Sequence, residues 1–189
     1  MEPRATPASF KQPFDLRAIV LVGMMGAGKT AVGRRLAREL GWRFVDADQE
    51  IEKAAGTSIA NIFAEVGEAE FRHSERQIIA RLLQDRRPQV LALGGGAFID
   101  PETRALVREC GISVWLRADL EVLVKRTARR DDRPLLKGGD PRARLAALLE
   151  RREPIYAEAD LAVDSGDGPL RGIVARILEQ LPQDGEEQG

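Results

Sequence analysis

The residues best suited to chemistry lie at positions 23–30, where the sequence GMMGAGKT matches the phosphate-binding pattern GxxxxGK[ST] in full. Glycines let the backbone curl so that successive N–H groups face one point and form an anion site. Lys29 can reach the β- and γ-phosphates of a nucleotide, and the Thr30 hydroxyl can ligate Mg²⁺. The nucleotide-binding residues expected are Gly26, Ala27, Gly28, Lys29, Thr30 and Ala31. The alternative is a glycine-rich turn that binds nothing, and the strand and helix predicted on either side count against it.

Two aspartates in the sequence FVDADQEI form a second candidate site. Asp46 and Asp48 are two residues apart, which suggests divided roles, one toward a metal ion and one toward a substrate. A base within hydrogen-bond reach of an alcohol is what phosphoryl transfer to that alcohol requires. The alternative is that Asp48 only caps the following helix, which aspartate does well. Capping alone would not require Asp46.

Scattered arginines are the third signal. Arg72 lies in EAEFRHSE, Arg133 in DDRPLL, and Arg151 and Arg152 in ERREPIY. The arginine fork pairs with carboxylates and neutralises transferring phosphates. The alternative is an ordinary solvated helix surface, which accounts for most of the 29 basic residues. Side-chain chemistry alone does not single out these four.

The elements that must position these residues follow from short apolar runs alternating with helical patterns. Strands are expected at 18–22, 44–45, 90–93, 112–116 and 161–163. Helices are expected at 30–40, 48–55, 59–66, 68–83, from Pro101 onward, and at 120–129, 141–156 and 170–181. This alternation predicts an α/β fold, with a parallel sheet covered by helices on both faces. Ligands of such sheets bind outside the carboxyl ends of the strands.

Length and composition suit one compact domain, expected at 17–181, because the 189 residues are 43% hydrophobic and 31% charged. We expect a disordered arm at 1–16, a lid-like loop at about 130–140 and a disordered tail at 182–189. The net charge of -1 argues against nucleic acid or an anionic membrane as a partner. The single cysteine, Cys110, allows no internal disulfide and fits a reducing compartment, so a cytoplasmic location is expected. The chain is also expected to be a monomer.

Six segments resemble the shikimate kinase family in order and spacing, from about residue 18 to residue 165. They are LVGMMGAGKTAVGRRLA, FVDADQEIE, SIANIFAEVGEAEFRHSE, LALGGGAF, RPLL and RREPIYAEAD. Many NTPases share the first pattern, whereas the combination is far more specific. The resemblance implies a P-loop NTPase fold of the nucleoside monophosphate kinase type, with a five-stranded parallel sheet. It also implies Mg²⁺-dependent transfer of the ATP γ-phosphate to the 3-hydroxyl of shikimate, a step in aromatic amino-acid biosynthesis that gives shikimate 3-phosphate and ADP.

The resemblance also implies roles for the acceptor-binding residues. Asp48 matches the family aspartate that binds the shikimate hydroxyls and acts as base, and Asp46 matches the one that helps to hold Mg²⁺. Arg72 and Arg152 match the arginines that bind the shikimate carboxylate. The spacing RxPxY selects Arg152 over Arg151.

Further roles fall on the glycine turn and on two more arginines. Gly94, Gly95 and Gly96 match the turn that lines the shikimate pocket. Arg133 matches the arginine of a lid that closes over the phosphates, where it would act in catalysis with Lys29. Arg126 aligns with an arginine placed near adenine in other members.

Rival functions remain open at the level of sequence. Another small-molecule kinase is the nearest, acting on gluconate or on a nucleotide, although a nucleotide acceptor would require base recognition that the sequence does not reveal. A non-catalytic ATP-binding module would be favoured by loss of Lys29, Asp48 or a substrate arginine, and all are present. Nucleic-acid binding would depend on the arginine-rich stretch 126–152, against which the overall charge argues.

Overall fold

The computed structural model describes residues 18–128, 140–166 and 168–182. The predicted arm at 1–16, Arg133 with nearly all of the predicted lid, and all but the first residue of the predicted tail lie outside these residues.

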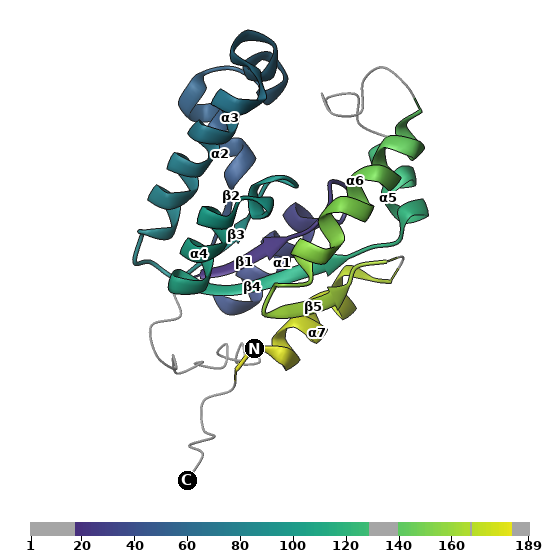
Figure 1. Ribbon diagram of the computed structural model, residues 1–189. Coiled ribbons are helices and arrows are strands. Elements are labelled where there is room, and N and C mark those ends of the chain that lie inside the picture. The colour runs from purple at the N-terminus through teal and green to yellow at the C-terminus, as the bar shows by residue number, and fades with distance from the viewer. Residues whose placement is uncertain (1–17, 129–139, 167, 183–189) are drawn as a thin grey trace, which may run out of the picture.

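Five parallel strands form one sheet in the order β2-β3-β1-β4-β5 (Figure 1). The strands are β1 (Ala18–Val22), β2 (Arg43–Asp46), β3 (Gln89–Ala92), β4 (Gly111–Arg117) and β5 (Leu161–Asp164). All five residues of the central strand β1 are buried, because it has a strand on each side and helices over both faces. The α/β fold with a five-stranded parallel sheet is therefore confirmed.

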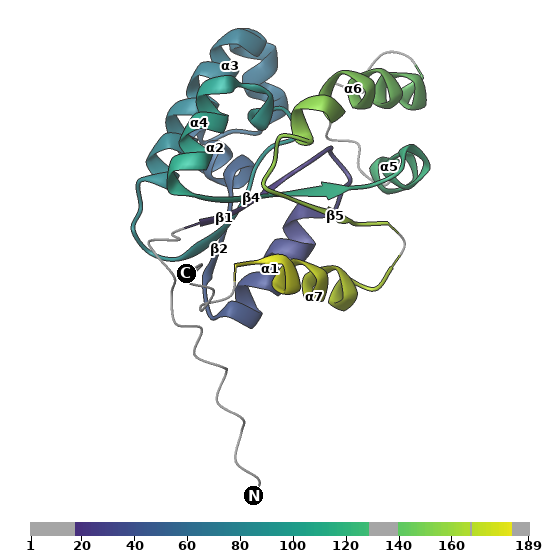
Figure 2. The same ribbon diagram turned by 60° about the horizontal axis from the view of Figure 1, so that its bottom comes forward.

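Helices cover both faces of the sheet, with α1 and α7 packed together on one face and α3 and α4 on the other (Figure 2). The helices are α1 (Lys29–Leu40), α2 (Ala47–Ala55), α3 (Ile59–Leu83), α4 (Pro101–Cys110), α5 (Leu120–Thr127), α6 (Pro141–Tyr156) and α7 (Leu170–Gln180), with a short 3₁₀ helix η1 (Ala97–Ile99). No helix in the described part of the chain is both long and apolar enough to span a bilayer.

Helix α3 contains one non-helical residue, Gly67, with φ 80° and ψ 174°. This residue separates the two helices that the sequence predicts at 59–66 and 68–83. The bend lets Phe63, before Gly67, pack against Phe71, after it, with ring centres 4.5 Å apart. Phe63 and Phe71 both line the cleft at the edge of the sheet, so one wall of that cleft comes from both halves of α3.

The carboxyl ends of β1, β2 and β3 lie level with one another. Ala92 of β3 is in register with Leu21 of β1 on one side and with Asp46 of β2 on the other. Because the strands are parallel, the three segments that follow them meet at one edge of the sheet. These segments contain the phosphate-binding pattern, the two aspartates and the glycine turn, which is residues 94–96.

Candidate active site

A cleft of about 580 Å³ opens at this edge, a size typical of small-molecule sites. It brings together most of the residues that the sequence predicts, namely Gly26, Gly28, Lys29, Thr30, Ala31, Asp46, Asp48, Arg72, Gly94, Gly95, Gly96, Arg126 and Arg152. Two predicted residues are not among its lining. Ala27 is buried and its N–H donates to the Met24 carbonyl at 3.1 Å, and Arg133 lies outside the described residues.

The phosphate side of the cleft is built from backbone. Gly28 precedes the first residue of α1 and has φ 92°, a left-handed conformation that glycine adopts without strain. Glycine offers no side chain to cap the helix, so the N–H groups of its first turn can face an anion, aided by the helix dipole. The local sequence therefore produces a cradle for phosphate at the start of α1.

The Lys29 side chain lies over the same loop. Its ammonium group donates to the carbonyl oxygens of Gly23 at 2.8 Å and Met24 at 2.9 Å. These contacts hold a positive charge at the backbone cradle. The loop thus places both hydrogen-bond donors and a cation where a nucleotide phosphate would lie.

Thr30, Asp46 and Asp48 form one connected group. The Thr30 hydroxyl donates to Asp46 Oδ2 at 2.8 Å, and Asp46 Oδ1 accepts from the Asp48 backbone N–H at 3.2 Å. Asp46 is therefore the N-cap of α2, and the alternative in which Asp48 is the cap is wrong. Since Asp46 performs the capping, the Asp48 carboxylate can serve another role.

The oxygens of Thr30 and Asp46 are suited to Mg²⁺, which prefers hydroxyl, carboxylate, phosphate and water ligands. Within the described residues there is no group of three or more His, Cys, Asp or Glu side chains that could hold a metal. Mg²⁺ usually binds through one or two protein oxygens together with water and substrate phosphate.

The Asp48 carboxylate faces the glycine turn. A Cβ atom added at Gly94 would lie 2.6 Å from Asp48 Oδ1 and 3.0 Å from Glu75 Oε1. A side chain at position 94 would thus displace both carboxylates. Absence of a side chain there allows Asp48 to approach the end of β3 closely.

Glu75 is a member of the site that the sequence analysis did not assign. It is only 3% exposed and accepts a hydrogen bond from Arg72 Nη1 at 2.7 Å. Burial raises the pKa of Glu75, the positive charge of Arg72 opposes that rise, and the nearby negative charge of Asp48 adds to it. The signal for this residue is its spacing, since residues three apart on a helix share a face.

Aromatic rings and a second carboxylate also orient Arg72. Its guanidinium carbon lies 5.2 Å from the centre of the Phe71 ring and 5.9 Å from that of Phe63. Arg72 Nη2 also lies 3.3 Å from Glu68 Oε1. Rings of this kind attract a cation and limit its motion. The Arg72 fork is thereby fixed at the wall of the cleft.

Arg152 reaches the cleft from α6. It is 9% exposed, and its Nη1 donates to the Gly95 carbonyl at 3.1 Å. Tyr156, one turn further along α6, donates its hydroxyl to the same carbonyl, and burial raises the pKa of Tyr156 to about 12. The neighbouring Arg151 is exposed and donates to the Ala147 carbonyl of its own helix at 3.2 Å. Of the two adjacent arginines, the structure brings Arg152 to the site.

Arg126 has backbone partners at the opposite end of the cleft. Its Nη1 donates to the carbonyls of Ser165 at 2.9 Å and Gly26 at 3.3 Å, and its Nη2 donates to the Gly166 carbonyl at 2.8 Å. The side chain therefore ties the phosphate-binding loop to the segment after β5. These bonds place Arg126 beside the cradle.

A parallel α/β sheet, a complete phosphate-binding loop after β1 and a carboxylate pair after β2 define the class of P-loop kinases. The family model described as shikimate kinase matches residues 25–182. The chain belongs to the shikimate kinase family and is an ATP-dependent phosphotransferase, as the sequence predicts.

Individual relatives agree with this assignment. The chain is 60% identical to a shikimate kinase of Paramagnetospirillum magneticum over 165 residues, which cover 87% of this chain and 84% of that one. It is 56% identical to a shikimate kinase of Caulobacter vibrioides over 171 residues, covering 90% and 85%. A solved shikimate kinase from Acinetobacter baumannii in complex with shikimate is 41% identical, with a TM-score of 0.84 and coverage of 87% and 92%.

Proposed function

We propose that this kinase transfers the γ-phosphoryl group of ATP to the 3-hydroxyl of shikimate, giving shikimate 3-phosphate and ADP. The observation that carries the proposal is the Asp48 carboxylate, which faces Gly94 in the same cleft as the phosphate cradle and two arginines. A carboxylate in this position can receive a proton from an acceptor alcohol. The similar Acinetobacter baumannii enzyme, solved in complex with shikimate, supports the choice of substrate.

Shikimate is a small carboxylate with hydroxyl groups around its ring, and the acceptor half of the cleft has complementary groups. Arg72 and Arg152 would pair with the shikimate carboxylate through charge-assisted hydrogen bonds. Asp48 would accept hydrogen bonds from the ring hydroxyls. The glycine turn would lie along the ring, because its lack of side chains lets Asp48 and Arg72 lie directly against Gly94 and Gly96. These contacts would fix the orientation of the 3-hydroxyl.

The phosphate half would bind ATP through backbone N–H groups at the start of α1 and through the Lys29 ammonium group. Thr30 and Asp46 would hold Mg²⁺, which when bound neutralises part of the charge on the phosphates. Lys29 would stabilise the negative charge that develops on the transferred group. As the phosphoryl group moves to the 3-hydroxyl oxygen, Asp48 would accept the proton of that hydroxyl.

Two further roles are proposed on the sequence resemblance. Arg133 would close over the phosphates as part of a lid at about 130–140, which would exclude water as a competing acceptor. Arg126 would lie near the adenine, a role supported by its hydrogen bond to the Gly26 carbonyl of the phosphate-binding loop. Replacement of Arg133 is expected to lower turnover more than shikimate affinity.

The setting of the reaction is also proposed. We expect a cytoplasmic monomer that binds neither nucleic acid nor membrane, in keeping with its net charge of -1. Light scattering of the purified chain tests the oligomeric state.

An acceptor panel tests the proposed function. ADP release is measured with ATP and Mg²⁺ in the presence of shikimate, gluconate or nucleoside monophosphates. Of these acceptors, only shikimate is expected to give substantial ADP release. Faster release with gluconate or with a nucleotide would assign the enzyme to one of the rival kinase classes, and no acceptor-dependent release would favour a binding module.

A further inference from the structure

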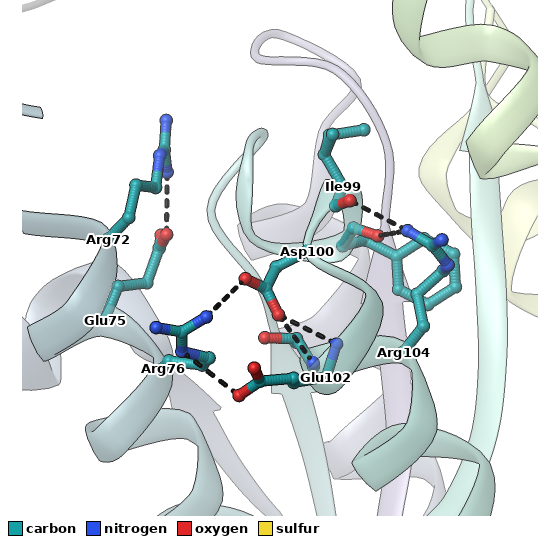
Figure 3. Close-up of polar contacts among 9 residues, drawn as sticks. Arg72, Glu75, Arg76, Ile99, Asp100, Glu102 and Arg104 are labelled. Atoms are coloured by element: carbon teal, nitrogen blue, oxygen red, sulfur yellow. Dashed lines mark hydrogen bonds and ion pairs between the residues drawn. The ribbon is translucent and has the colours of Figure 1, made fainter. Parts of the chain in front are cut away.

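Helix α3 contacts the glycine turn and its continuation at two points with matched spacing. At the first point the Arg72 guanidinium lies against Gly96, where an added Cβ atom would be 2.5 Å from Nη2. At the second point Arg76 Nη1 donates to Asp100 Oδ2 at 2.9 Å (Figure 3). The two contacts are four residues apart on both segments. Sliding of α3 along this segment would therefore break at least one of them.

Asp100 is a firm anchor because its two carboxylate oxygens have different partners. Oδ1 accepts from the backbone N–H groups of Glu102 at 2.9 Å and Thr103 at 3.0 Å, which caps α4. Oδ2 receives Arg76, whose Nε also lies 3.6 Å from Glu102 Oε2. The Arg76 and Asp100 side chains are 31% and 26% exposed, so water screens this pair less than a fully exposed one.

The segment between the glycine turn and Asp100 is held from its other side as well. Arg104 Nη1 donates to the carbonyls of Phe98 at 3.0 Å and Ile99 at 2.8 Å. Arg104 Nε also pairs with Glu158 Oε2 at 3.2 Å. Figure 3 shows Arg76 approaching from α3 and Arg104 from α4, on either side of Asp100. The Arg76–Asp100 pair thus joins α3 to a segment that α4 also holds through Arg104.

We infer that Arg76 is a positioning residue for acceptor binding. It is not among the residues that line the cleft, but it lies next to Glu75 and one helical turn from Arg72. By bonding to Asp100 it holds α3 where Arg72 and Glu75 face the glycine turn. The inference rests on the proposed function for the identity of the acceptor, since Arg72 is taken to bind the shikimate carboxylate.

The test compares steady-state constants of matched variants. Arg76→Gln removes the charge, and Asp100→Asn removes the ion pair while keeping a good helix cap. Each is expected to raise the shikimate KM roughly three- to tenfold, with kcat and the ATP KM within about twofold of wild type. The double variant should be no worse than Arg76→Gln alone, because Arg76→Gln already removes the ion pair that Asp100→Asn breaks. Arg76→Lys, which keeps a cation, should recover most of the loss.

Arg35→Gln is the matched control. It breaks an exposed ion pair with Glu39, 2.7 Å long, on α1, and should leave all three constants unchanged. An unchanged shikimate KM in folded Arg76→Gln would overturn the inference. Equal losses in the shikimate and ATP constants would overturn it too, because they would indicate a general structural role.

A second readout separates this inference from the proposed function. The η1 amides bond back to the glycine turn, with Ala97 N–H donating to the Gly94 carbonyl at 3.1 Å and Ile99 N–H to the Gly96 carbonyl at 3.2 Å. Amide hydrogen exchange at these positions should be faster in Arg76→Gln than in wild type or Arg35→Gln. This holds whichever acceptor the enzyme uses. Unchanged exchange would contradict the positioning role, whereas failure with shikimate in the acceptor panel would contradict the proposed function alone.

Discussion

The two halves of the cleft are built in different ways. The phosphate half comes mainly from residues 23–30, which supply backbone N–H donors and one lysine held by carbonyls of its own loop, and Asp46 joins it through Thr30. The acceptor half consists of side chains on three helices, with Asp48 on α2, Arg72 and Glu75 on α3, and Arg152 on α6. One half is local in sequence and the other exists only once the chain has folded.

This difference determines which substitutions should impair binding in each half of the cleft. A backbone cradle depends on glycine conformations and on the start of one helix, so distant substitutions should affect it little. The acceptor half depends on the relative placement of separate helices, and on contacts such as that of Arg152 with Gly95. Substitutions in that half should therefore change acceptor affinity or turnover while ATP affinity persists.

The largest expected effect is that of Asp48→Asn. The amide keeps the shape of the side chain but is a far weaker proton acceptor, and general bases contribute about 10²- to 10⁴-fold to rate. We expect kcat to fall by at least about 10²-fold while the Kd for ATP, measured by calorimetric titration, stays near wild type. A normally active variant would show that Asp48 is not the base, and lost ATP binding would contradict the separation of the two halves.

The next effect in size is that of Arg152→Ala. Charge-assisted hydrogen bonds contribute about 1.5–3 kcal/mol, so the Kd for shikimate should rise roughly ten- to a hundredfold. Arg151→Ala is the matched control, because the Arg151 side chain is exposed and donates to the Ala147 carbonyl of its own helix. Calorimetry that gave equal shikimate affinity for Arg152→Ala and Arg151→Ala would remove Arg152 from the acceptor half.

The smallest expected effect is on the pH dependence of stability, and it comes from Glu75 in the acceptor half. The folded pKa of Glu75 is raised by burial above the ordinary value of about 4.3 for glutamate. At pH values between the unfolded and folded pKa of Glu75, the native state binds more protons than the unfolded state. The contribution of Glu75 to stability is therefore lost as pH rises through its folded pKa.

Glu75→Gln should remove that contribution. Urea unfolding from pH 4 to 7 should therefore show wild type losing stability relative to the variant as pH increases. An equal pH dependence in both proteins would mean that Glu75 titrates normally.

The sequence locates the phosphate-binding loop, because the groups of that loop lie within one short motif with its flanking strand and helix. It also predicts the five strands, the helices and even the break in α3 at Gly67, since apolar runs and glycines are local signals. The family resemblance, not the spacing alone, singled out Arg72 and Arg152.

Features that depend on contacts between distant segments could not be predicted from the sequence. The bond from the Thr30 hydroxyl to Asp46 joins residues sixteen positions apart, and α2 begins at Ala47, one residue before the predicted start, so Asp46 is its cap. The role of Glu75 becomes visible when its burial and its contact with Arg72 are known. The bonds of Arg126 to Ser165 and Gly166 require α5 and β5 to be neighbours in space.

The central claim is that the two halves meet at one oxygen atom of the acceptor. Phosphorus NMR of the product made from ATP, Mg²⁺ and shikimate tests it most directly. The account predicts one phosphate ester, on the 3-hydroxyl, formed in equal amount with ADP. An ester on another hydroxyl, or inorganic phosphate with no ester, would contradict it.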